Sequence, residues 1–353
     1  MNKLTVPGAV LRGVVSAACK FSSTGGFGGA DLLHLEVKGG KLIAAMSTAV
    51  FSRVRVDCEG ELNLIGIDRR VLESFVSIGG NKKISIAVDG AKLVLSSRSR
   101  EAEIPVAEGV KYNAPVLKGL PAIKLSKNLA ARIAYLAEIA FGDSSRPELC
   151  CVLLDGKEAM SCNQRTVAVM DTASSHEKIA VPLLLAKQAQ EGDILYPGAK
   201  ETTLRSGPAT YTMSTPAKAQ KDYPLAAVHM LGKQTKQPSI TVDGEKLSAA
   251  IADCSACLSV LARTETVAHL AVVNGKLELT ASNGGAKFRA MIPAASQSES
   301  EDTFTAPLDG FMSVLPFLEG PVGLAIGEHQ DTFLVLKSGW VLFPAWNAGK
   351  KRK

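Results

Sequence analysis

Hydrophobic residues recur along the chain in stretches with two different spacings, and the succession of these stretches repeats three times. The first stretch of each repeat has apolar residues three or four positions apart, which predicts an amphipathic helix. The three stripes are Val10, Val14, Ala17 and Phe21; then Leu129, Ile133, Leu136 and Ala140; then Leu247, Ile251, Cys254, Leu258 and Leu261. Each third of the chain is therefore expected to contain a helix near its start.

A hairpin is predicted after each stripe, where a run of strand-forming residues reaches a Gly-Lys step. The three steps end at Lys41, Lys157 and Lys276, at nearly equal intervals that are each close to one third of the 353 residues. Asp155-Gly156 and Asn274-Gly275 are strong signals for a two-residue hairpin turn, because both turn residues must accept a positive φ.

A shorter helix and a closing pair of strands complete each repeat. The helices are expected in the ranges 68–77, 182–190 and 307–318, and the closing strands begin at Lys92, Thr202 and Thr332. Short strands joined by turns, with two helices per repeat, favour α+β layers over a parallel βαβ sheet. We therefore predict an α+β fold with three repeated domains, at 1–116, 117–234 and 235–353, the last ending in a basic tail.

Composition narrows the function classes. No apolar run approaches the roughly 20 residues that a membrane span needs, so a soluble protein without membrane contact is expected. Seven cysteines, an odd number, indicate reduced thiols of a cytoplasm rather than a disulfide framework. The net charge of +6, from 40 basic and 34 acidic residues, permits a polyanionic partner. The run Lys350 to Lys353 is expected to be a solvated tail, with attraction of acidic partner segments as the alternative.

Catalytic chemistry is not indicated. Cys254 and Cys257 have the spacing of a metal or redox pair, but Cys254 belongs to an apolar stripe and no second such pair exists, so a buried structural thiol is expected. The glycine-rich range 24–29 follows a predicted helix and lacks the Lys-Ser/Thr of a phosphate-binding loop. We predict no catalytic residue, no metal site and no cofactor.

Three copies of such a unit in one chain resemble the bacterial β sliding clamp, the processivity subunit of DNA polymerase III. The likeness is most specific in "LVLSSRSREAEIPV", "LCCVLLDGKEAMSCNQRTVAVMD" and the closing "SGWVLFPAW". It implies the DNA-clamp fold, with helices lining a ring and sheets outside, closed as a six-domain homodimer. It also implies a non-catalytic cytoplasmic protein, associated with the nucleoid, that encircles double-stranded DNA without reading its sequence. Such a clamp tethers a polymerase and a clamp loader through short peptide motifs.

The resemblance assigns DNA contacts to the helices, which can be checked against their charges. In the first two repeats these segments carry more basic than acidic residues, whereas the helices of the third repeat carry Asp243, Glu245, Asp253, Asp309 and Glu319 against two basic residues. Either that third of the channel attracts DNA less, or its acids point outward. The predicted DNA-binding residues are Arg12, Lys20, Thr24, Arg69, Arg70, Lys127, Arg132 and Lys187.

The resemblance also assigns a peptide pocket and a dimer contact. The pocket residues carried over are Leu149, Ser161, Asn163, Gln164, Arg165, Thr166, Tyr223, Leu225, Ala226, Val341, Phe343, Pro344, Ala345 and Trp346. For Val341 and Phe343, closure of the third domain's core is the alternative, and Phe343 is favoured for the pocket because Pro344 should free it from the sheet. The dimer contact is expected to join Arg100 and Glu101 of one chain to Val260 and Leu261 of the other.

Three departures from the family pattern indicate a divergent member, for which a phage or a plasmid is a candidate source. The loop from Met160 to Thr166 keeps only the arginine of the family's usual Ala-Thr-Asp-Gly-His-Arg-Leu, with Ser161 a near match for Thr. Glu101 stands where a phenylalanine is frequent, and the chain is basic where the family is acidic. Two other classes stay open: a repeat-built viral shell or tail ring without DNA, and a redox or metal enzyme using Cys254 and Cys257.

Overall fold

The computed structural model of the protein describes residues 2–22, 32–79, 82–98, 100–109, 112, 115–142, 145–163, 166–216, 219–233, 238–259, 266–283, 285–296, 303–326 and 331–343. It divides into two compact units, which are described separately. Unit 1 comprises Met1–Lys127 and Ala189–Thr215, and unit 2 comprises Asn128–Gln188 and Pro216–Lys353. The second predicted domain thus contributes to both units, and the three predicted domain boundaries stay a prediction.

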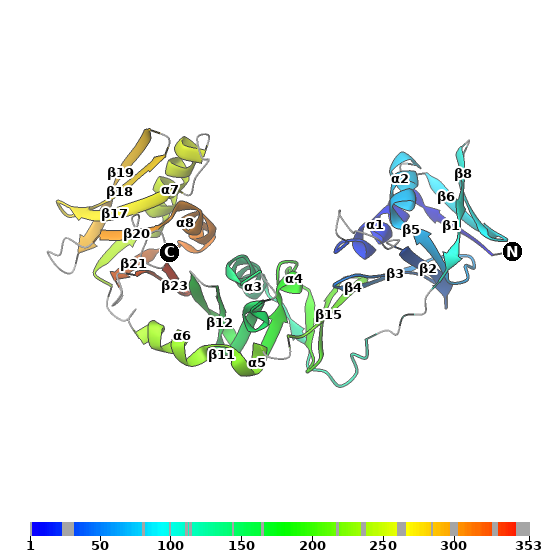
Figure 1. Ribbon diagram of the computed structural model, residues 1–353, viewed down its shortest axis with the longest axis horizontal. Coiled ribbons are helices and arrows are strands. Elements are labelled where there is room, and N and C mark those ends of the chain that lie inside the picture. The colour runs from blue at the N-terminus through cyan, green and yellow to red at the C-terminus, as the bar shows by residue number, and fades with distance from the viewer. Residues whose placement is uncertain are drawn as a thin grey trace. The chain divides into compact units, whose positions relative to one another are not determined.

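Unit 1 contains two antiparallel sheets and two helices that pack together, α1 (Gly8–Ala18) and α2 (Arg69–Gly79). The four-stranded sheet has the order β1-β6-β7-β8. The nine-stranded sheet has the order β10-β13-β14-β15-β4-β3-β2-β5-β9 (Figure 1). The strands are β1 Lys3–Pro7, β2 Leu32–Lys38, β3 Lys41–Ser47, β4 Phe51–Asp57, β5 Ile65–Asp68, β6 Lys83–Asp89, β7 Lys92–Ser97, β8 Arg100–Pro105, β9 Ala107–Glu108, β10 Ile123–Lys124, β13 Ile194–Pro197, β14 Glu201–Ser206 and β15 Ala209–Ser214.

Unit 2 is built on a ten-stranded sheet with the order β11-β12-β23-β22-β21-β16-β19-β18-β17-β20. Its helices are α3 Lys127–Ile139, α4 Leu183–Ala186, α5 Ala219–Asp222, α6 Leu225–Gly232, α7 Gly244–Ser259 and α8 Leu308–Val314, with 3₁₀ turns η1 Pro147–Leu149 and η3 Leu315–Phe317. Its strands are β11 Cys151–Cys162, β12 Val167–Pro182, β16 Ile240–Asp243, β17 Val267–Val273, β18 Lys276–Asn283, β19 Ala286–Ser296, β20 Thr303–Pro307, β21 Pro321–Ile326, β22 Thr332–Leu336 and β23 Gly339–Phe343.

The predicted repeat is confirmed element by element. The first helices are α1, α3 and α7, and the second helices are α2, α4 and α8. The closing hairpins are β7–β8, β14–β15 and β22–β23, all antiparallel. Two of the Gly-Lys hairpins are β2–β3 and β17–β18, and the third is the turn within β11, where Gly156 has a φ of 58° and pairing with β12 shifts its register.

The apolar stripe predicted for the first helix is wrong by about one position. Val10 is 38% exposed, and the buried residues of α1 are Gly8, Leu11, Val14, Val15 and Ala18. The cause is a strand that the spacing did not predict: β1 pairs with β6 as far as Pro7, and the Gly8 amide donates to the Lys82 carbonyl at 2.8 Å. This anchor starts the helix at Gly8 and turns Leu11 rather than Val10 toward the core.

One connection occurs in both units and joins consecutive repeats. In unit 1, β4 pairs with β15, so that a strand of the first repeat continues into the sheet of the second. In unit 2, β12 pairs with β23 in the same way, from Val167↔Leu342 to Met170↔Gly339. Both sheets are therefore continuous across a junction between repeats.

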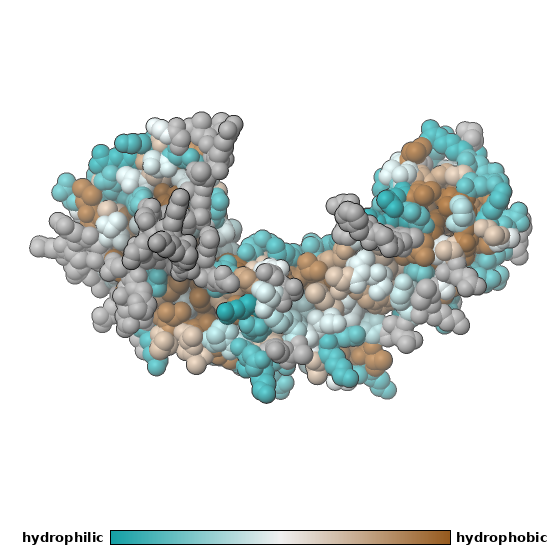
Figure 2. Space-filling model, in the orientation of Figure 1, coloured by the Kyte–Doolittle hydropathy of each residue, from teal (hydrophilic) through white to brown (hydrophobic). Residues whose placement is uncertain are grey.

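Surface hydropathy is mixed on the face shown in Figure 2, where hydrophilic and hydrophobic residues alternate over each unit. Exposed large hydrophobic side chains include Val10 on α1 and Val71 and Ile78 on α2. Within the described residues, no helix combines the length and the apolarity that crossing a membrane would take.

Candidate nucleic-acid and peptide sites

The two helices of unit 1 enclose a cleft with basic side chains at its rim. Arg12 and Ser16 lie four positions apart on one face of α1, and Lys20 follows the end of this helix by two residues; all three line the cleft. Glu73 and Ser77 of α2 line the opposite wall, and the cleft encloses about 500 Å³. Arg12 and Lys20 are exposed, and neither takes part in an ion pair with another described residue. The Lys20 Nζ atom lies 5.5 Å from the centroid of the Tyr211 ring, so Arg12 is the more available of the two cations to an anion.

The remaining predicted cations of unit 1 differ in their surroundings. Arg70 is exposed, with its Nε atom 3.6 Å from the Asp68 carboxylate. Arg69 is 8% exposed, and its Nη1 atom lies 3.7 Å from a carboxylate oxygen of Glu73, one turn along α2. A phosphate on the surface could not reach Arg69 without moving this side chain, so the structure gives no support to Arg69 as a contact. Thr24 lies outside the described residues.

The other predicted cations sit on α3 and just beyond α4; Lys127 is the last residue of the first segment of unit 1, and Arg132 and Lys187 belong to unit 2. Lys127, the first residue of α3, is exposed. Arg132 donates a hydrogen bond through Nη1 to the Asp171 carbonyl, and the Lys187 Nζ atom lies 3.2 Å from the Glu138 carboxylate. Lys127 makes no such contact with another described residue, so it is the most available of the three to a ligand.

The helices of the third repeat do not share this basic character. Glu245 and Asp253 on α7 and Asp309 on α8 are all exposed, against an exposed Lys246. The uneven distribution that the sequence shows is therefore present at the surface.

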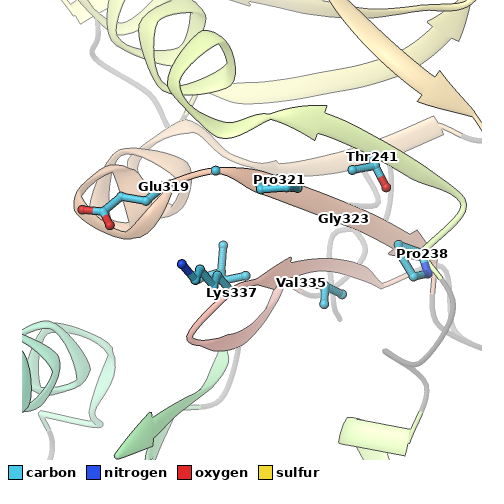
Figure 3. A pocket seen from close by; sticks show the side chains of 9 residues that line it. Pro238, Thr241, Glu319, Pro321, Gly323, Val335 and Lys337 are labelled. Atoms are coloured by element: carbon cyan, nitrogen blue, oxygen red, sulfur yellow. The ribbon is translucent and has the colours of Figure 1, made fainter. Parts of the chain in front are cut away.

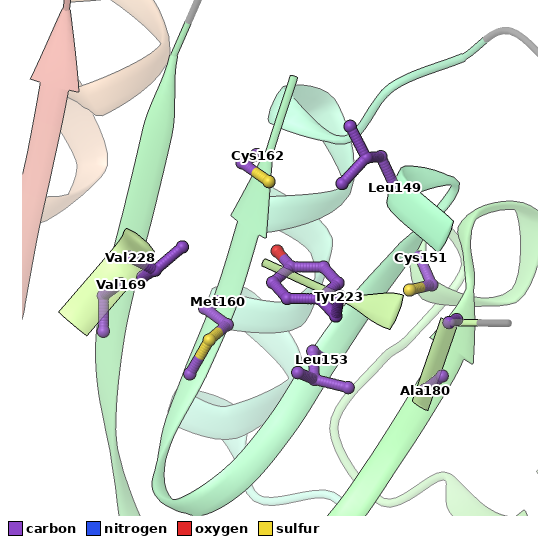
Figure 4. Packing of buried hydrophobic residues seen from close by; sticks show 10 residues of the cluster. Leu149, Cys151, Leu153, Met160, Cys162, Val169, Ala180, Tyr223 and Val228 are labelled. Carbon is purple, nitrogen blue, oxygen red and sulfur yellow. The ribbon is translucent and has the colours of Figure 1, made fainter. Parts of the chain in front are cut away.

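Most described residues of the predicted peptide pocket surround one core cluster of unit 2. The cluster comprises Leu149, Cys151, Leu153, Met160, Cys162, Val169, Ala180, Ala219, Tyr223 and Val228, with Leu225 and Trp340 packed against it (Figure 4). Leu149, Ser161 and Tyr223 are buried, Asn163, Thr166 and Leu225 are half-buried, and Ala226 is exposed. The structure thus brings these residues together, with the buried members as a floor and the others at the surface.

Asn163 holds the loop at the end of β11 in place. Its side-chain amide donates to the Ile139 carbonyl at 2.8 Å, and its carbonyl oxygen accepts from the Thr166 amide at 2.7 Å. The backbone of Asn163 also donates to the Thr166 carbonyl at 2.9 Å. These bonds tie the loop to the end of α3, which fixes the half-buried rim of the pocket. Gln164 and Arg165 lie outside the described residues.

Burial sets the acidity of the side chains beneath this rim. The pKa of the Cys151 thiol is raised to about 12, mainly by desolvation and further by the neighbouring Cys162. Burial also raises the pKa of Cys162 and of Tyr223, whose hydroxyl lies beside the Cys162 thiol (Figure 4). All three groups are neutral at physiological pH, so the floor is apolar and uncharged.

Val341 and Phe343 are core residues, as in the alternative considered from the sequence. Val341 is fully buried and Phe343 is 1% exposed. Phe343 pairs with Thr332 in the sheet, and its ring packs edge-on against Phe311 of α8 at a centroid distance of 5.3 Å. The expectation that Phe343 is free of the sheet is therefore wrong, because the ladder continues to the last described residue of β23. Pro344, Ala345 and Trp346 lie outside the described residues.

Sequence reasoning missed the residues that join the pocket to the third repeat. Trp340 and Val167 pack against the core cluster above and also against a second one formed by Ala325, Phe333 and Leu342. The signal was the unbroken apolar run from Trp340 to Phe343, which is typical of a strand buried on both faces.

The predicted dimer contact involves an edge strand of unit 1. Arg100 and Glu101 are exposed on β8, the edge strand of the four-stranded sheet, and Arg100 donates through Nη1 to the Ile78 carbonyl at 3.0 Å. Their predicted partners Val260 and Leu261 lie outside the described residues.

A separate hollow of about 550 Å³ in unit 2 is lined by residues that include Pro238, Pro321, Val335 and Lys337 (Figure 3), and no predicted site residue lines it.

The cysteine pair on α7 is divided between core and surface. Cys254 is fully buried, as predicted, with its pKa raised to about 11 mainly by desolvation, and Cys257 is exposed. Within the described residues, no three His, Cys, Asp or Glu side chains gather as a metal site would require.

The whole chain is similar in structure to solved sliding clamps. The DNA polymerase III beta subunit of Caulobacter crescentus matches with a TM-score of 0.81 at 14% identity, over 98% of this chain and 100% of that one. The Helicobacter pylori beta clamp bound to a DNA ligase peptide matches with a TM-score of 0.78 at 15% identity, over 98% and 100%. The Bartonella birtlesii sliding clamp bound to griselimycin matches with a TM-score of 0.81 at 9% identity, over 98% and 99%.

No protein-family model matches the sequence, and no curated protein matches it either. Identities this low establish fold only. The predicted α+β fold is thereby confirmed: the chain has the fold of the bacterial DNA polymerase III beta subunit, the β sliding clamp.

Proposed function

We propose that this protein is a sliding clamp, a non-catalytic cytoplasmic protein that encircles duplex DNA and tethers DNA enzymes to it. The observation that carries the proposal is the full-length likeness in fold to several sliding clamps, each covered over nearly its whole length. The exposed cations of α1 and α3 support it, because a protein that slides needs attraction to phosphates without contacts to base edges.

DNA binding is assigned to Arg12, Lys20, Arg70 and Lys127 first, and to Arg132 and Lys187 second. The first four are exposed, with Arg70 at 3.6 Å from Asp68 and Lys20 at 5.5 Å from the Tyr211 ring centroid. Of the last two, Arg132 is half-buried and donates to the Asp171 carbonyl, and Lys187 lies 3.2 Å from the Glu138 carboxylate. Arg69 is left out because it is buried against Glu73. The acidic surface of α7 and α8 should make the third repeat the weakest contributor.

Charge removal tests this assignment. Arg12→Ala with Lys20→Ala should weaken duplex binding to the same extent for unrelated sequences and reduce the slope of log K against log salt by about 1 per lost contact. Lys83→Ala with Lys92→Ala removes the same charge from the four-stranded sheet and serves as the control. Equal effects of the two pairs would rule out a specific role for Arg12 and Lys20.

Partner proteins are proposed to dock as short extended peptides at the rim of the unit 2 cluster. The accessible anchors are Leu225 and Ala226 of α6 together with the loop that Asn163 and Thr166 hold in place. Support comes from the Helicobacter pylori clamp, which is bound to a DNA ligase peptide. A few apolar anchors on a small, water-excluding patch can supply most of the affinity of such a peptide.

A pair of variants on one helix tests the pocket. Leu225→Ala should weaken binding of a polymerase-derived peptide by roughly 1 to 2 kcal/mol, as expected for an interface anchor. Met230, which is 61% exposed on the same helix, provides the matched control Met230→Ala. Phe343→Ala is unsuitable, because deleting a buried aromatic ring destabilises the fold by about 3 kcal/mol or more. Unchanged affinity in Leu225→Ala would place the pocket elsewhere.

Ring closure is proposed to occur by homodimerisation through the exposed edge strand β8. An edge strand has backbone N–H and C=O groups that are available to hydrogen-bond with a strand of another chain, and closed two-fold assemblies are the commonest oligomers. Glu101, which is charged and exposed, should make this contact weak. Sedimentation should show a dimer that dissociates on dilution, and Glu101→Phe should strengthen it. A monomer at all concentrations up to tens of micromolar would remove the ring from the proposal.

A further inference from the structure

The junction between repeats in unit 1 carries arginines where the corresponding junction in unit 2 is apolar. The closing hairpins align the two junctions, since Ser206↔Ala209 in β14–β15 corresponds to Leu336↔Gly339 in β22–β23. One residue further on, Thr210 pairs with Arg53 in unit 1, and Trp340 pairs with Val169 in unit 2. The apolar pair that packs beneath the proposed peptide pocket is thus replaced by an arginine and a threonine.

These residues belong to one row across the nine-stranded sheet. Arg205 pairs with Thr210, Thr210 with Arg53, Arg53 with Ala45, and Ala45 with His34. Directly paired residues point to the same face of a sheet, and alternate residues along a strand do so as well. Arg55 and Phe51 therefore share this face with Arg53, whereas Ser52 and Val54 point to the other face and are each 1% exposed.

We define the arginine face as Arg53, Arg55 and Arg205 with the flanking rings of Phe51 and Tyr112. Arg55 and Arg205 are exposed, and Arg53, Phe51 and Tyr112 are half-buried. The Tyr112 ring packs against Phe51 at 5.4 Å and edge-on against His34 at 4.8 Å, measured between centroids. The arginines lie on β4 and β14, with β15 between these two strands in the sheet, and β15 and β4 are seen side by side in Figure 1.

The positive charge of this face is not balanced by the described residues. None of their ion pairs involves Arg53, Arg55 or Arg205. Desolvation and the nearby charge of Arg55 lower the pKa of Arg53, and Glu36 is the one carboxylate that opposes this effect. Glu36, Asp57 and Glu201 share this face by strand alternation, but none of them forms an ion pair with the three arginines. A bound polyanionic segment would give these arginines carboxylate partners.

We propose that the arginine face binds an extended, acidic segment of a partner protein, independently of the peptide pocket in unit 2. Arg53 and Arg55 are alternate residues of one strand, so their separation of about 7 Å matches alternate side chains of an extended peptide. Guanidinium groups bind carboxylates in a bidentate manner, and Phe51 and Tyr112 supply an apolar wall beside them.

A single-stranded nucleic acid fits the surface less well. Such ligands stack their bases on exposed aromatic faces. Here His34 is 3% exposed and Tyr196 is 8% exposed with the Arg205 guanidinium 5.4 Å from its ring centroid. The rings are thus engaged with protein groups, and the guanidinium groups are the accessible features.

The test uses the full chain and a fluorescently labelled peptide of about ten residues with glutamate at alternate positions. The wild-type protein should bind it in a salt-sensitive manner, and Arg53→Ala with Arg205→Ala should weaken binding roughly tenfold or more. Lys3→Ala with Lys83→Ala, which removes two exposed lysines from the four-stranded sheet of the same unit, should change binding by less than about twofold. If Arg53→Ala lowers the melting temperature, Arg55→Ala with Arg205→Ala replaces it, because both side chains are exposed.

Three results would overturn the proposal. The first is no binding of the glutamate peptide, or equal binding of its glutamine counterpart. The second is an equal loss in the lysine control, which would reduce the effect to overall charge. The third is a loss of single-stranded DNA binding in the arginine variant without a loss of peptide binding, which would make the face a nucleic-acid site.

Discussion

Cys151 and Tyr223 meet in the core cluster of unit 2, where both side chains are shielded from water. No spacing in the sequence predicts this contact, because the two residues come from β11 and from the connection between α5 and α6.

Exposure of the predicted DNA-binding cations could be predicted from the sequence for Arg12 and Lys127 but not for Arg69. Its burial depends on how α2 packs and on Glu73 one turn away. Charge alone therefore selects candidates, and packing decides which of them can meet a ligand.

Cys151 should make the stability of the protein fall at alkaline pH. Its thiol has an ordinary pKa near 9 in the unfolded chain and about 12 in the folded protein, so the folded state retains a proton that the unfolded state loses. The resulting stability is fully present below pH 9 and is lost as the pH rises from 9 to 12, with about 1 kcal/mol gone by pH 10.

Thermal unfolding of Cys151→Ala between pH 8 and pH 10.5 measures this contribution. The variant should be less stable than the wild type at pH 8, and its melting temperature should fall less over the range, since the titrating group is absent. Cys257→Ala, at an exposed position of α7, is the control. Parallel pH profiles for wild type and Cys151→Ala would show that other groups set the alkaline limit.

Strand β23 is the element on which the junction of unit 2 depends, because it pairs with β12 on one side and β22 on the other. Hairpins with Asp-Gly or Asn-Gly turns could be predicted from the sequence, since few residues accept the required φ. The strands β1, β10 and β16 could not, because they are short and show no long alternation. Burial of Phe343 was only an alternative from the sequence, because it depends on the pairing of Phe343 with Thr332 of β22.

Gly339 at the start of β23 should tolerate no side chain. It has a φ of 145°, and a Cβ atom would lie 2.0 Å from the Val169 carbonyl oxygen and 2.8 Å from the Met170 Cα atom. Both neighbours are backbone of β12, which cannot move aside without breaking the ladder. Gly339→Ala should therefore cost about 3 kcal/mol or more in unfolding free energy.

The variant Gly285→Ala is the control that distinguishes the cost of backbone strain from the cost of a steric clash. Gly285 has a φ of 89°, and a Cβ atom added there would meet nothing within 4 Å, so Gly285→Ala should cost only the strain of about 1 kcal/mol. Chemical denaturation of both variants provides the comparison. A Gly339→Ala variant as stable as Gly285→Ala would mean that β12 and β23 are not paired as described.

At the scale of the whole chain, the threefold repeat is the strongest information in the sequence. Equal intervals between Lys41, Lys157 and Lys276 predict three copies of one unit, and the structure has the corresponding elements in each copy. The division between the two compact units could not be predicted in this way, because it depends on the pairing of β4 with β15, whose residues are far apart in sequence. Assembly and ligands stay predictions, since they involve surfaces of more than one molecule.

The central claim is that the protein is held on DNA by encircling it, and topology tests this most directly. The protein is incubated at high concentration with nicked circular DNA, so that dissociated chains re-form rings around the circle. The DNA with its bound protein is then separated from unbound protein at high salt. Salt screens phosphate contacts, whereas a closed ring needs none of them to stay in place. We expect the protein to remain with the circle and to be released when a single cut makes the DNA linear. Equal retention before and after the cut would contradict the account, because binding would then depend on direct contacts alone.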